Sequence, residues 1–458
     1  MTRKIIVAIL KLILRVFFRR IEINGLERVP DDGPVMFVLN HPNGLVDPVF
    51  ILTLAPRKVS FLAKSTLFKM PVISFFIKKM EAIPVYRKQD TGEDTSKNQE
   101  TFKISREVLK SGGTIAICPE GVSHNEPRLL PLKTGAARIA LGAASAGQKN
   151  IRLKIVPCGL YYTAKTKFRS SALLYFGDTI DVNRVELNEK SEPPREAVEA
   201  LTDKIENELR DVVLNAEHDE AMQTIERAER VFSSDFEKDH SDEVLGLTRQ
   251  FELRRRFIEG YAYHRQHSPE RLNALLSRIE RYESELEQMG LDPEELAPPE
   301  SLTSVAFHAF SQTLFFALLL PFAIIGIVVN YPAYVLIKYI AIKLSNNYND
   351  VVSTIKIVAS ALFFPLSWNV LAALCYWLVG WKLALTSLII APISGYIAVR
   401  FTEEFDRYLA GALSLGFFIT RKGFFKRLLV ERRAIREEIQ KLGREAQTKS
   451  VPPAPTGG

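Results

Sequence analysis

Between residues 21 and 180, short apolar runs alternate with segments in which apolar residues recur at helical spacing. The apolar runs lie at 35–39, 82–86, 113–118, 153–160 and 171–176, and the helical patterns at 48–55, 66–80, 99–111 and 134–147. Such alternation is typical of an α/β fold, in which helices flank a largely parallel sheet. An amphipathic helical stripe over 195–214 closes this domain, which we place at 21–214.

The first apolar run leads directly into candidate chemistry. The run ends at Leu39 and is followed by Asn40 and His41, and Asp47 comes after a turn that contains Pro42 and Gly44. A histidine oriented by a carboxylate can act as a general base toward a hydroxyl group. An idle surface histidine near a capping Asp would give the same pattern. The ends of the other strands must therefore decide between the two interpretations, because the carboxyl ends of parallel strands meet at one edge of the sheet.

The first 20 residues predict an amphipathic helix. Apolar residues recur at helical spacing on one face, and basic residues including Lys11, Arg15 and Arg19 interrupt the apolar run. No small-residue cleavage site follows, so we do not expect a cleaved signal peptide. The pattern suits a helix in the membrane interface, with basic side chains near anionic headgroups. A surface helix docked on the α/β domain is the alternative.

In the second half of the chain, charged residues and apolar residues lie in different segments. Residues 215–300 are charged and helical in pattern, which predicts a helical insert or linker. Although His264 and His267 lie three residues apart there, no third ligand accompanies them, and we expect no metal site. Residues 301–337, 357–381 and 383–399 contain no Asp, Glu, Lys or Arg. Apolar stretches of about 20 residues predict membrane helices.

We expect the membrane region, 301–402, to form two helical hairpins. The first would pair 305–329 with 331–345, and the second 355–379 with 382–400. The basic helical tail, 403–446, is expected on the cytoplasmic side by the positive-inside rule. The catalytic domain should share that side, which requires an even number of crossings. The end at 447–458 is typical of a disordered segment.

Composition and charge limit the kinds of binding partner that this chain can have. The net charge of +7 would suit nucleic acid or an anionic membrane surface. The apolar third of the chain favours the lipid bilayer, and no nucleic-acid recognition motif is present. Cys118, Cys158 and Cys375 are too few and too scattered for a disulfide framework. We therefore expect a reduced, cytosol-facing catalytic part.

Three further motifs follow the His-Asp pair and make the pattern specific. They are Ile83-Pro84-Val85-Tyr86-Arg87, Pro119-Glu120-Gly121 and Val156-Pro157-Cys158-Gly159. Together the four blocks, in this order over about 120 residues, resemble the glycerolipid acyltransferase family. The members of this family acylate glycerol phosphates and lysophospholipids.

The resemblance implies roles for individual residues. His41 and Asp47 match the catalytic dyad, with five residues between them where four are commonest. The longer spacing resembles a subgroup that performs the first acylation of glycerol 3-phosphate or dihydroxyacetone phosphate. Because an added helical residue would turn Asp47 by about 100° away from His41, the dyad requires a non-helical loop over 42–46. Arg87 would bind the acceptor phosphate bidentately, and Glu120 and Gly121 would shape its site.

The third block departs from the family pattern. The family usually continues with Thr-Arg after Glu-Gly, whereas this chain has Val122, Ser123 and His124. An expected phosphate ligand is therefore missing. Arg128, Lys133 or His124 could supply the charge, and for Arg128 and Lys133 a solvated surface position is an equal alternative.

The resulting hypothesis is a membrane-bound O-acyltransferase of phospholipid biosynthesis. It would move a fatty acyl group from a thioester of coenzyme A or acyl carrier protein to glycerol 3-phosphate or dihydroxyacetone phosphate, with no further cofactor. No Gly-x-Ser-x-Gly elbow is present, so direct transfer is preferred to an acyl-enzyme. The alternatives are a lysophosphatidate or lysophospholipid acyltransferase and a non-catalytic lipid-binding scaffold. Assembly into a homo-oligomer stays open.

Overall fold

The computed structural model describes residues 2–90, 92–146, 151–216, 219–236, 246–291, 302–345 and 349–450. The expected disordered end at 447–458 lies largely outside these ranges. The chain divides into two compact units. The first comprises Met1–Ala216, Leu247–Phe251 and Leu344–Ile357, and the second contains the rest of the chain.

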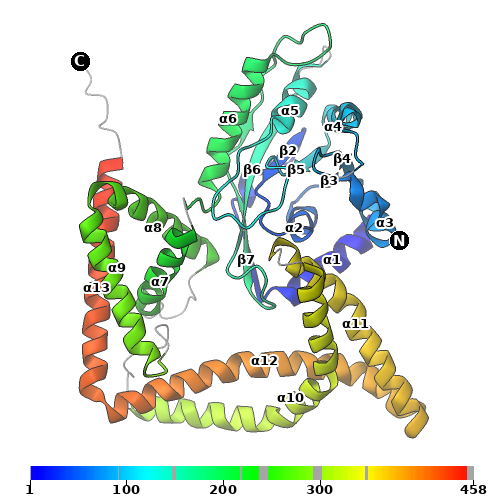
Figure 1. Cartoon of the computed structure of the whole chain (residues 1–458). Helices are drawn as coiled ribbons and strands as arrows, with labels where there is room; N and C mark the ends of the chain where they lie inside the picture. The colour runs from blue at the N-terminus through cyan, green and yellow to red at the C-terminus, as the bar shows by residue number, and fades with distance from the viewer. Residues whose placement is uncertain are drawn as a thin grey trace. The chain divides into compact units, whose positions relative to one another are not determined.

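The first unit is built on one eight-stranded sheet (Figure 1). Its strands are β1 (Arg20–Asn24), β2 (Val35–Leu39), β3 (Val59–Lys64), β4 (Ile83–Val85), β5 (Thr114–Ile117), β6 (Lys154–Tyr162), β7 (Ser171–Phe176) and β8 (Ile180–Asp181). The order is β1-β7-β6-β2-β5-β3-β4, with β8 also on β6. Only β7 and β8 run antiparallel to β6, and the other pairs are parallel. The predicted α/β fold with a largely parallel sheet is confirmed.

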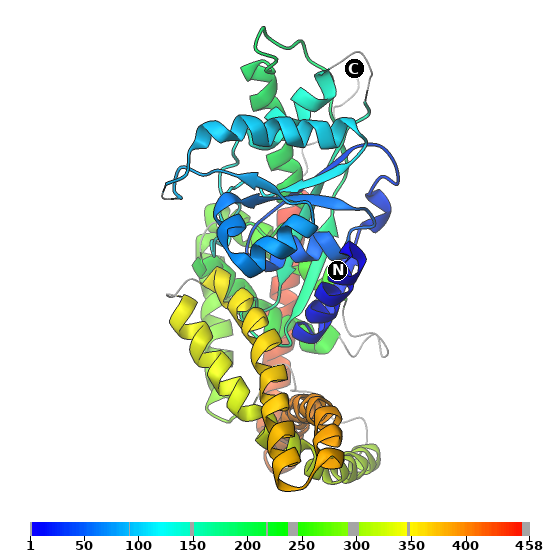
Figure 2. The same cartoon turned by 90° about the vertical axis from the view of Figure 1, so that its right-hand side faces the viewer.

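Helices cover both faces of this sheet. They are α1 (Arg3–Phe17), α2 (Val46–Leu54), α3 (Pro71–Lys79), α4 (Asn98–Lys110), α5 (Gly135–Ser145) and α6 (Arg195–Asp211). In Figure 2, α1 in dark blue and α4 in light blue lie on opposite sides of the strands. Alternate β2 residues enter different cores: Met36 packs with residues of α5, and Phe37 with residues of α2. Burial on both sides explains why β2 is a continuous apolar run.

Three strands were not predicted from the sequence pattern: β1, β3 and the short β8. The predicted helix at 66–80 is instead a 3₁₀ turn, Ser65–Lys69, followed by α3 from Pro71. Ser60 breaks the apolar run of β3, although in the fold its side chain is buried. The strand matters for the site, because β3 lies between β5 and β4 and carries Lys64 at its carboxyl end.

Helix α1 is docked on the sheet domain by one face and exposes apolar side chains on another. Ile6, Leu14 and Phe17 are buried, and Arg3 donates hydrogen bonds of 2.6 Å to the carbonyls of Met80 and Val59. The exposed apolar side chains are Ile5, Ile9, Leu12 and Val16. One face of α1 is thus docked on the α/β domain, as the alternative interpretation predicted. The exposed apolar side chains on the other face suit the membrane interface that the sequence pattern suggested.

In the second unit, the charged insert and the basic tail share a core. Helices α7 (Asp219–Phe236), α9 (Pro269–Glu287) and α13 (Lys422–Ser450) pack through a common apolar cluster that includes Ile279 and Ile435. In α8 (Leu247–His267), His264 is buried and bonded to the carbonyl of Leu442, and His267 stacks on Tyr263. Both histidines are therefore engaged in packing.

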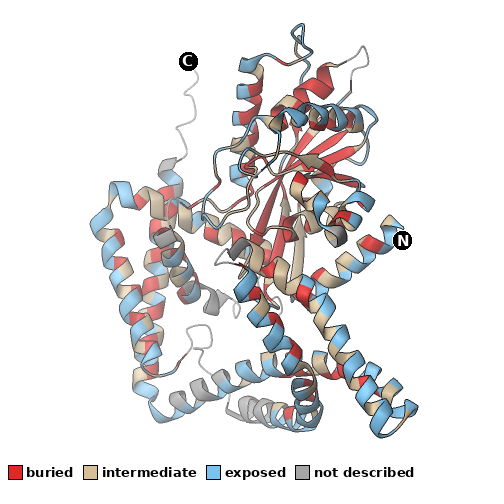
Figure 3. Ribbon diagram, turned by 45° about the vertical axis from the view of Figure 1, so that its right-hand side comes forward, coloured by how far each residue is buried: buried red, intermediate tan, exposed pale blue. Residues whose placement is uncertain are grey.

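Three apolar helices make up the rest of the second unit and also supply Leu344–Ile357 of the first. They are α10 (Leu302–Ser345), α11 (Asn349–Leu378) and α12 (Trp381–Thr420). Within the described residues, three helices are long and apolar enough to cross a membrane. Many of their large apolar side chains are exposed, in contrast to the buried sheet (Figure 3). Exposure on this scale indicates contact with lipid, and the chain is membrane-associated.

The expected first hairpin is wrong, because α10 continues through residue 330 as one helix. Pro332 lies within the helix just after the expected turn, and a proline within a helix can kink it without ending it. Asn330, beside this proline, bonds the carbonyls of Gly326 (2.9 Å) and Ala391 (3.2 Å) and accepts the Trp368 indole N–H (2.8 Å). Its amide is thus satisfied between three helices, where a turn would have placed it in solvent.

Gly159 in β6 gives a prediction for stability. A Cβ at this position would overlap the backbone carbonyl of Val212, which follows α6. We expect Gly159→Ala to lower the free energy of unfolding by about 3 kcal/mol or more, since backbone on both sides prevents relaxation. Thermal unfolding of the detergent-solubilised chain measures the effect. Gly260→Ala is the control, because a Cβ there would meet no atom within 4 Å and only helix propensity changes. Equal melting temperatures for the two variants would contradict the prediction.

Candidate active site

The carboxyl ends of four neighbouring parallel strands bring the sequence motifs to one edge of the sheet. β2 leads into His41, β5 leads toward Glu120, and β3 and β4 end beside Lys64 and Arg87. The strand order explains why motifs far apart in the sequence lie together. It also extends the set by Lys64, which comes from the strand that the sequence pattern did not reveal.

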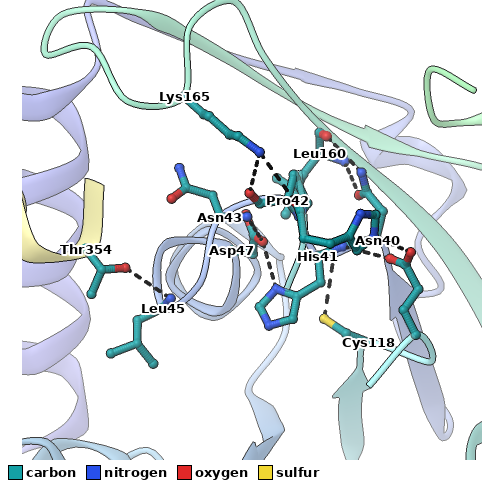
Figure 4. Close-up of polar contacts among 12 residues, drawn as sticks. Asn40, His41, Pro42, Asn43, Leu45, Asp47, Cys118, Leu160, Lys165 and Thr354 are labelled. Carbon is teal, nitrogen blue, oxygen red and sulfur yellow. Dashed lines mark hydrogen bonds and ion pairs between the residues drawn. The ribbon is translucent and has the colours of Figure 1, made fainter. Parts of the chain in front are cut away.

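His41 and Asp47 are in direct contact. The Nδ1 atom of His41 lies 2.8 Å from Oδ2 of Asp47 (Figure 4). Residues 42–45 form a non-helical turn, and α2 begins at Val46, one residue inside the loop that we expected. The structure thus brings the two side chains within hydrogen-bond distance, as the predicted dyad requires. The additional residue of the longer spacing is absorbed in the turn, so that Asp47 points back from the first turn of the helix.

Asp47 is fully buried and held by two further donors. Its Oδ2 accepts the backbone N–H of Asn43 at 2.7 Å, and its Oδ1 accepts the hydroxyl of Tyr162 at 2.6 Å. A buried carboxylate requires such partners to offset the loss of hydration. Tyr162 was not predicted. It lies at the end of β6, in no motif, and only the pairing of β6 with β2 brings it to the site.

Asn40 fixes the end of β2 to its neighbour. Its side-chain amide donates to the carbonyl of Leu160 (3.1 Å) and accepts the N–H of the same residue (2.8 Å), as Figure 4 shows. The side chain therefore repeats the pattern of a peptide group in a sheet. The hydrogen-bonded ladder extends by one step, up to the residue that precedes His41.

Glu120 faces inward and organises the backbone around His41. Its side chain is buried, with Oε1 accepting the N–H of His41 (3.1 Å) and Oε2 accepting the N–H of Leu130 (2.8 Å). Oε2 also pairs with Nε2 of His124 at 2.5 Å. With both oxygens occupied, Glu120 supports the site from behind. His124, which we considered as a phosphate ligand, is turned toward this carboxylate.

The surroundings of His41 favour its protonated form. Burial alone would lower the pKa of His41, but the hydrogen bond to the Asp47 carboxylate and the negative charge of that group act in the opposite direction, and the pKa is raised. The pKa of the Cys118 thiol is itself raised by burial. A base next to a fixed carboxylate is stabilised in the charged form that proton transfer creates.

The expected basic residues divide into two places. Nη1 of Arg87 donates to the carbonyl of Gly121 (3.1 Å), and the side chain of Lys133 lies against the same glycine. Gly121 has φ of +74°, and a Cβ there would collide with Lys133. Arg128 lies elsewhere: its Nε is 4.0 Å from Glu126, and the residue lines a small pocket.

That pocket, of about 40 Å³, is also lined by His41, Glu120 and His124. Arg128 is therefore near the candidate base, whereas Arg87 and Lys133 gather around Gly121. The sequence alone could not separate the two groups.

Comparison with known proteins agrees with the motifs. Residues 20–161 match the family model described as Acyltransferase, and residues 237–449 match the one described as Glycerol-3-phosphate acyltransferase 2 C-terminal domain. Both models describe acyltransferases, as the resemblance of the motifs had suggested. A single family model thus spans most of the insert, the apolar helices and the tail, which the sequence pattern had divided into three parts.

Proteins similar to this chain include two of Saccharomyces cerevisiae. Glycerol-3-phosphate O-acyltransferase 1 is 28% identical over 465 residues, covering 78% of this chain and 59% of the relative. Glycerol-3-phosphate O-acyltransferase 2 is 32% identical over 213 residues, covering 46% and 28%. A chloroplastic 1-acyl-sn-glycerol-3-phosphate acyltransferase of Brassica napus is 30% identical over 163 residues, covering 35% and 43%.

The chain therefore spans 59% or less of the length of these three relatives. Among solved structures, the 1-acyl-sn-glycerophosphate acyltransferase of Thermotoga maritima is 20% identical, with a TM-score of 0.34. The match covers 46% of this chain and 78% of that one.

The contact with Asp47 predicts the titration of His41. Asp47→Asn removes the negative charge while keeping the size of the side chain, so the pKa of His41 should fall toward the ordinary value of about 6.5 or below it. Histidine NMR titration of the labelled chain in detergent measures this, with a His41→Gln spectrum for assignment. Tyr162→Phe removes a hydrogen bond but no charge and should leave the pKa of His41 raised. An unchanged His41 pKa in Asp47→Asn would refute the pairing.

Proposed function

We propose that this chain transfers a fatty acyl group from a thioester of coenzyme A or acyl carrier protein to the hydroxyl of glycerol 3-phosphate or dihydroxyacetone phosphate. The observation that carries the proposal is the buried His41–Asp47 contact at the strand edge that also bears Arg87. The match to a glycerol-3-phosphate acyltransferase C-terminal domain and the names of the yeast relatives support this acceptor.

His41 would act as the general base. Because Nδ1 is engaged by Asp47, Nε2 is the ring nitrogen that takes the hydroxyl proton. The alkoxide oxygen then forms a bond to the thioester carbonyl carbon, the carbon–sulfur bond breaks, and the imidazolium returns its proton to the leaving thiolate. Asp47 stabilises the imidazolium between these steps. No further cofactor takes part in the proposed reaction.

Direct transfer is favoured over an acyl-enzyme. Cys118 lies beside Asn40 and is a candidate nucleophile, but burial raises the pKa of its thiol and keeps it in the neutral, weakly nucleophilic form. The acceptor phosphate would bind Arg87 and Lys133 near Gly121, with Glu120 holding the backbone behind them. Arg128 would contact the substrate from the pocket that contains His41.

The catalytic domain is proposed to lie on the cytoplasmic face, where the thioester donor is made. Basic residues in α13 agree with that side by the positive-inside rule. For the tail and the catalytic domain to share one face, an even number of the three apolar helices must cross the bilayer. The remaining helix would lie along the surface.

A lysophosphatidate acyltransferase is the second candidate, supported by the name of the Brassica relative. Both acceptors carry a phosphate monoester and a free hydroxyl, so the described site suits either. A lipid-binding scaffold without activity is the third candidate, and it would not depend on His41.

Loss of His41 should abolish transfer. We expect His41→Gln to lower kcat by about 10³-fold or more, because no other base contacts the reacting hydroxyl in this mechanism. Release of free thiol from acyl-CoA in the presence of glycerol 3-phosphate measures the rate. His267→Gln is the matched control, since His267 lies in α8, stacked on Tyr263. Full activity of His41→Gln would rule out the mechanism, and a wild type inactive on every acceptor would favour the scaffold.

Acceptor preference separates the first two candidates. We expect a higher kcat/KM with glycerol 3-phosphate or dihydroxyacetone phosphate than with lysophosphatidate when the purified wild type is assayed with each. We expect this preference because the longer His-to-Asp spacing resembles that of the first-acylation subgroup. The match of residues 237–449 to a glycerol-3-phosphate acyltransferase C-terminal domain points to the same acceptor. Exclusive use of lysophosphatidate would overturn this preference while leaving the roles of His41 and Asp47 in place.

A further inference from the structure

The guanidinium of Arg87 is already paired with a carboxylate of this chain. Nε and Nη2 of Arg87 donate to the two oxygens of Asp90 at 2.9 and 2.7 Å, which is a bidentate contact. Nη1 donates to the carbonyl of Gly121. The pair is largely shielded from solvent, with side-chain exposures of 19% for Arg87 and 9% for Asp90. The edge of the guanidinium that would bind phosphate bidentately is therefore occupied by Asp90.

The local fold holds Asp90 in this place. The N–H of Asp90 donates to the carbonyl of Arg87 (3.1 Å), so that the two residues close one turn directly after β4. The hydrogen bonds from Arg87 hold the pKa of Asp90 below its ordinary value against the effect of burial. The charges of Lys64 and Lys133 act in the same direction. Arg87 is thus in direct contact with this carboxylate, and the charges of two lysines also favour its ionised form.

We propose that Asp90 is an internal counter-ion that the phosphate of the acceptor must displace from Arg87, and that this exchange selects phosphate monoesters over phosphodiesters. The proposal rests on the proposed function for the identity of the acceptor. It adds a specificity-determining residue that no sequence motif indicated.

Charge explains the selection. Lys64, Arg87 and Lys133 carry three positive charges, and Asp90 offsets one of them. A phosphodiester carries one negative charge, as Asp90 does, but Asp90 is tethered three residues from Arg87 and competes at a high effective concentration. A phosphate monoester carries up to two charges and an additional oxygen, so it can engage Arg87 and a lysine at once. Only the monoester gains enough from the cluster to release the carboxylate.

Asp90→Asn tests the exchange. The variant keeps the shape of the side chain but removes its charge, and we expect methyl phosphate to bind several-fold more tightly and dimethyl phosphate at least tenfold more tightly. The preference for the monoester should therefore fall. Calorimetric titration of the full chain in detergent micelles gives both affinities. Glu93→Gln is the matched control, because Glu93 lies in the same loop but pairs with Lys69, and it should change neither affinity.

Other outcomes would overturn the inference. Weaker binding of both probes to Asp90→Asn would make Asp90 a support for Arg87, and an equal gain for both would remove its role in selection. Arg87→Gln should lose methyl phosphate binding, and unchanged binding would place the anion elsewhere. Titrations with glycerol 3-phosphate and with lysophosphatidate show which monoester gains from Asp90→Asn, and a gain for neither contradicts the proposal. Because no acyl donor is present, these results are independent of whether the chain transfers acyl groups.

Discussion

Burial of one carboxylate is the constraint around which the candidate site is arranged. Asp47 has no exposed surface, and its two oxygens receive the imidazole of His41, the N–H of Asn43 and the hydroxyl of Tyr162. An ionised carboxylate without these partners would be costly to bury. The turn before α2 and the end of β6 must therefore stay in register with β2. The same requirement fixes the ring of His41, since its Nδ1 is one of the donors that Asp47 needs.

The α/β fold could be predicted from the sequence because it depends on local patterns, whereas the His41–Asp47 contact was predicted through the resemblance of four ordered motifs to a known family. β2 is apolar throughout, since it is buried on both faces, and residues 42–45 after it form a turn that ends where α2 begins at Val46. Tyr162 and Lys64 could not be placed, because their relation to the site depends on strand order. Arg128 and Lys133 lie five residues apart, but whether they act together depends on a loop whose path the sequence pattern does not determine.

In the apolar region, the sequence pattern predicted a turn that the structure does not contain. We placed a turn between residues 329 and 331, yet α10 continues through this point, where Asn330 bonds Trp368 and Ala391. Tertiary contacts thus override a local preference. The insert and the tail were likewise separated by composition, although Ile279 and Ile435 belong to one cluster. Segments that flank the apolar helices are tied together across more than 150 residues of sequence.

The amide of Asn40 has a consequence for motion. Because this side chain pairs with both backbone groups of Leu160, the residue before His41 belongs to the hydrogen-bonded ladder of the central strands. Loops usually open locally at a low free-energy cost, whereas central strands open only with the whole domain. The turn that carries His41 therefore begins at a residue that should open only together with the central strands. Hydrogen exchange at Leu160 would be as slow as that of the central strands, and the base would keep its position until the domain itself unfolds.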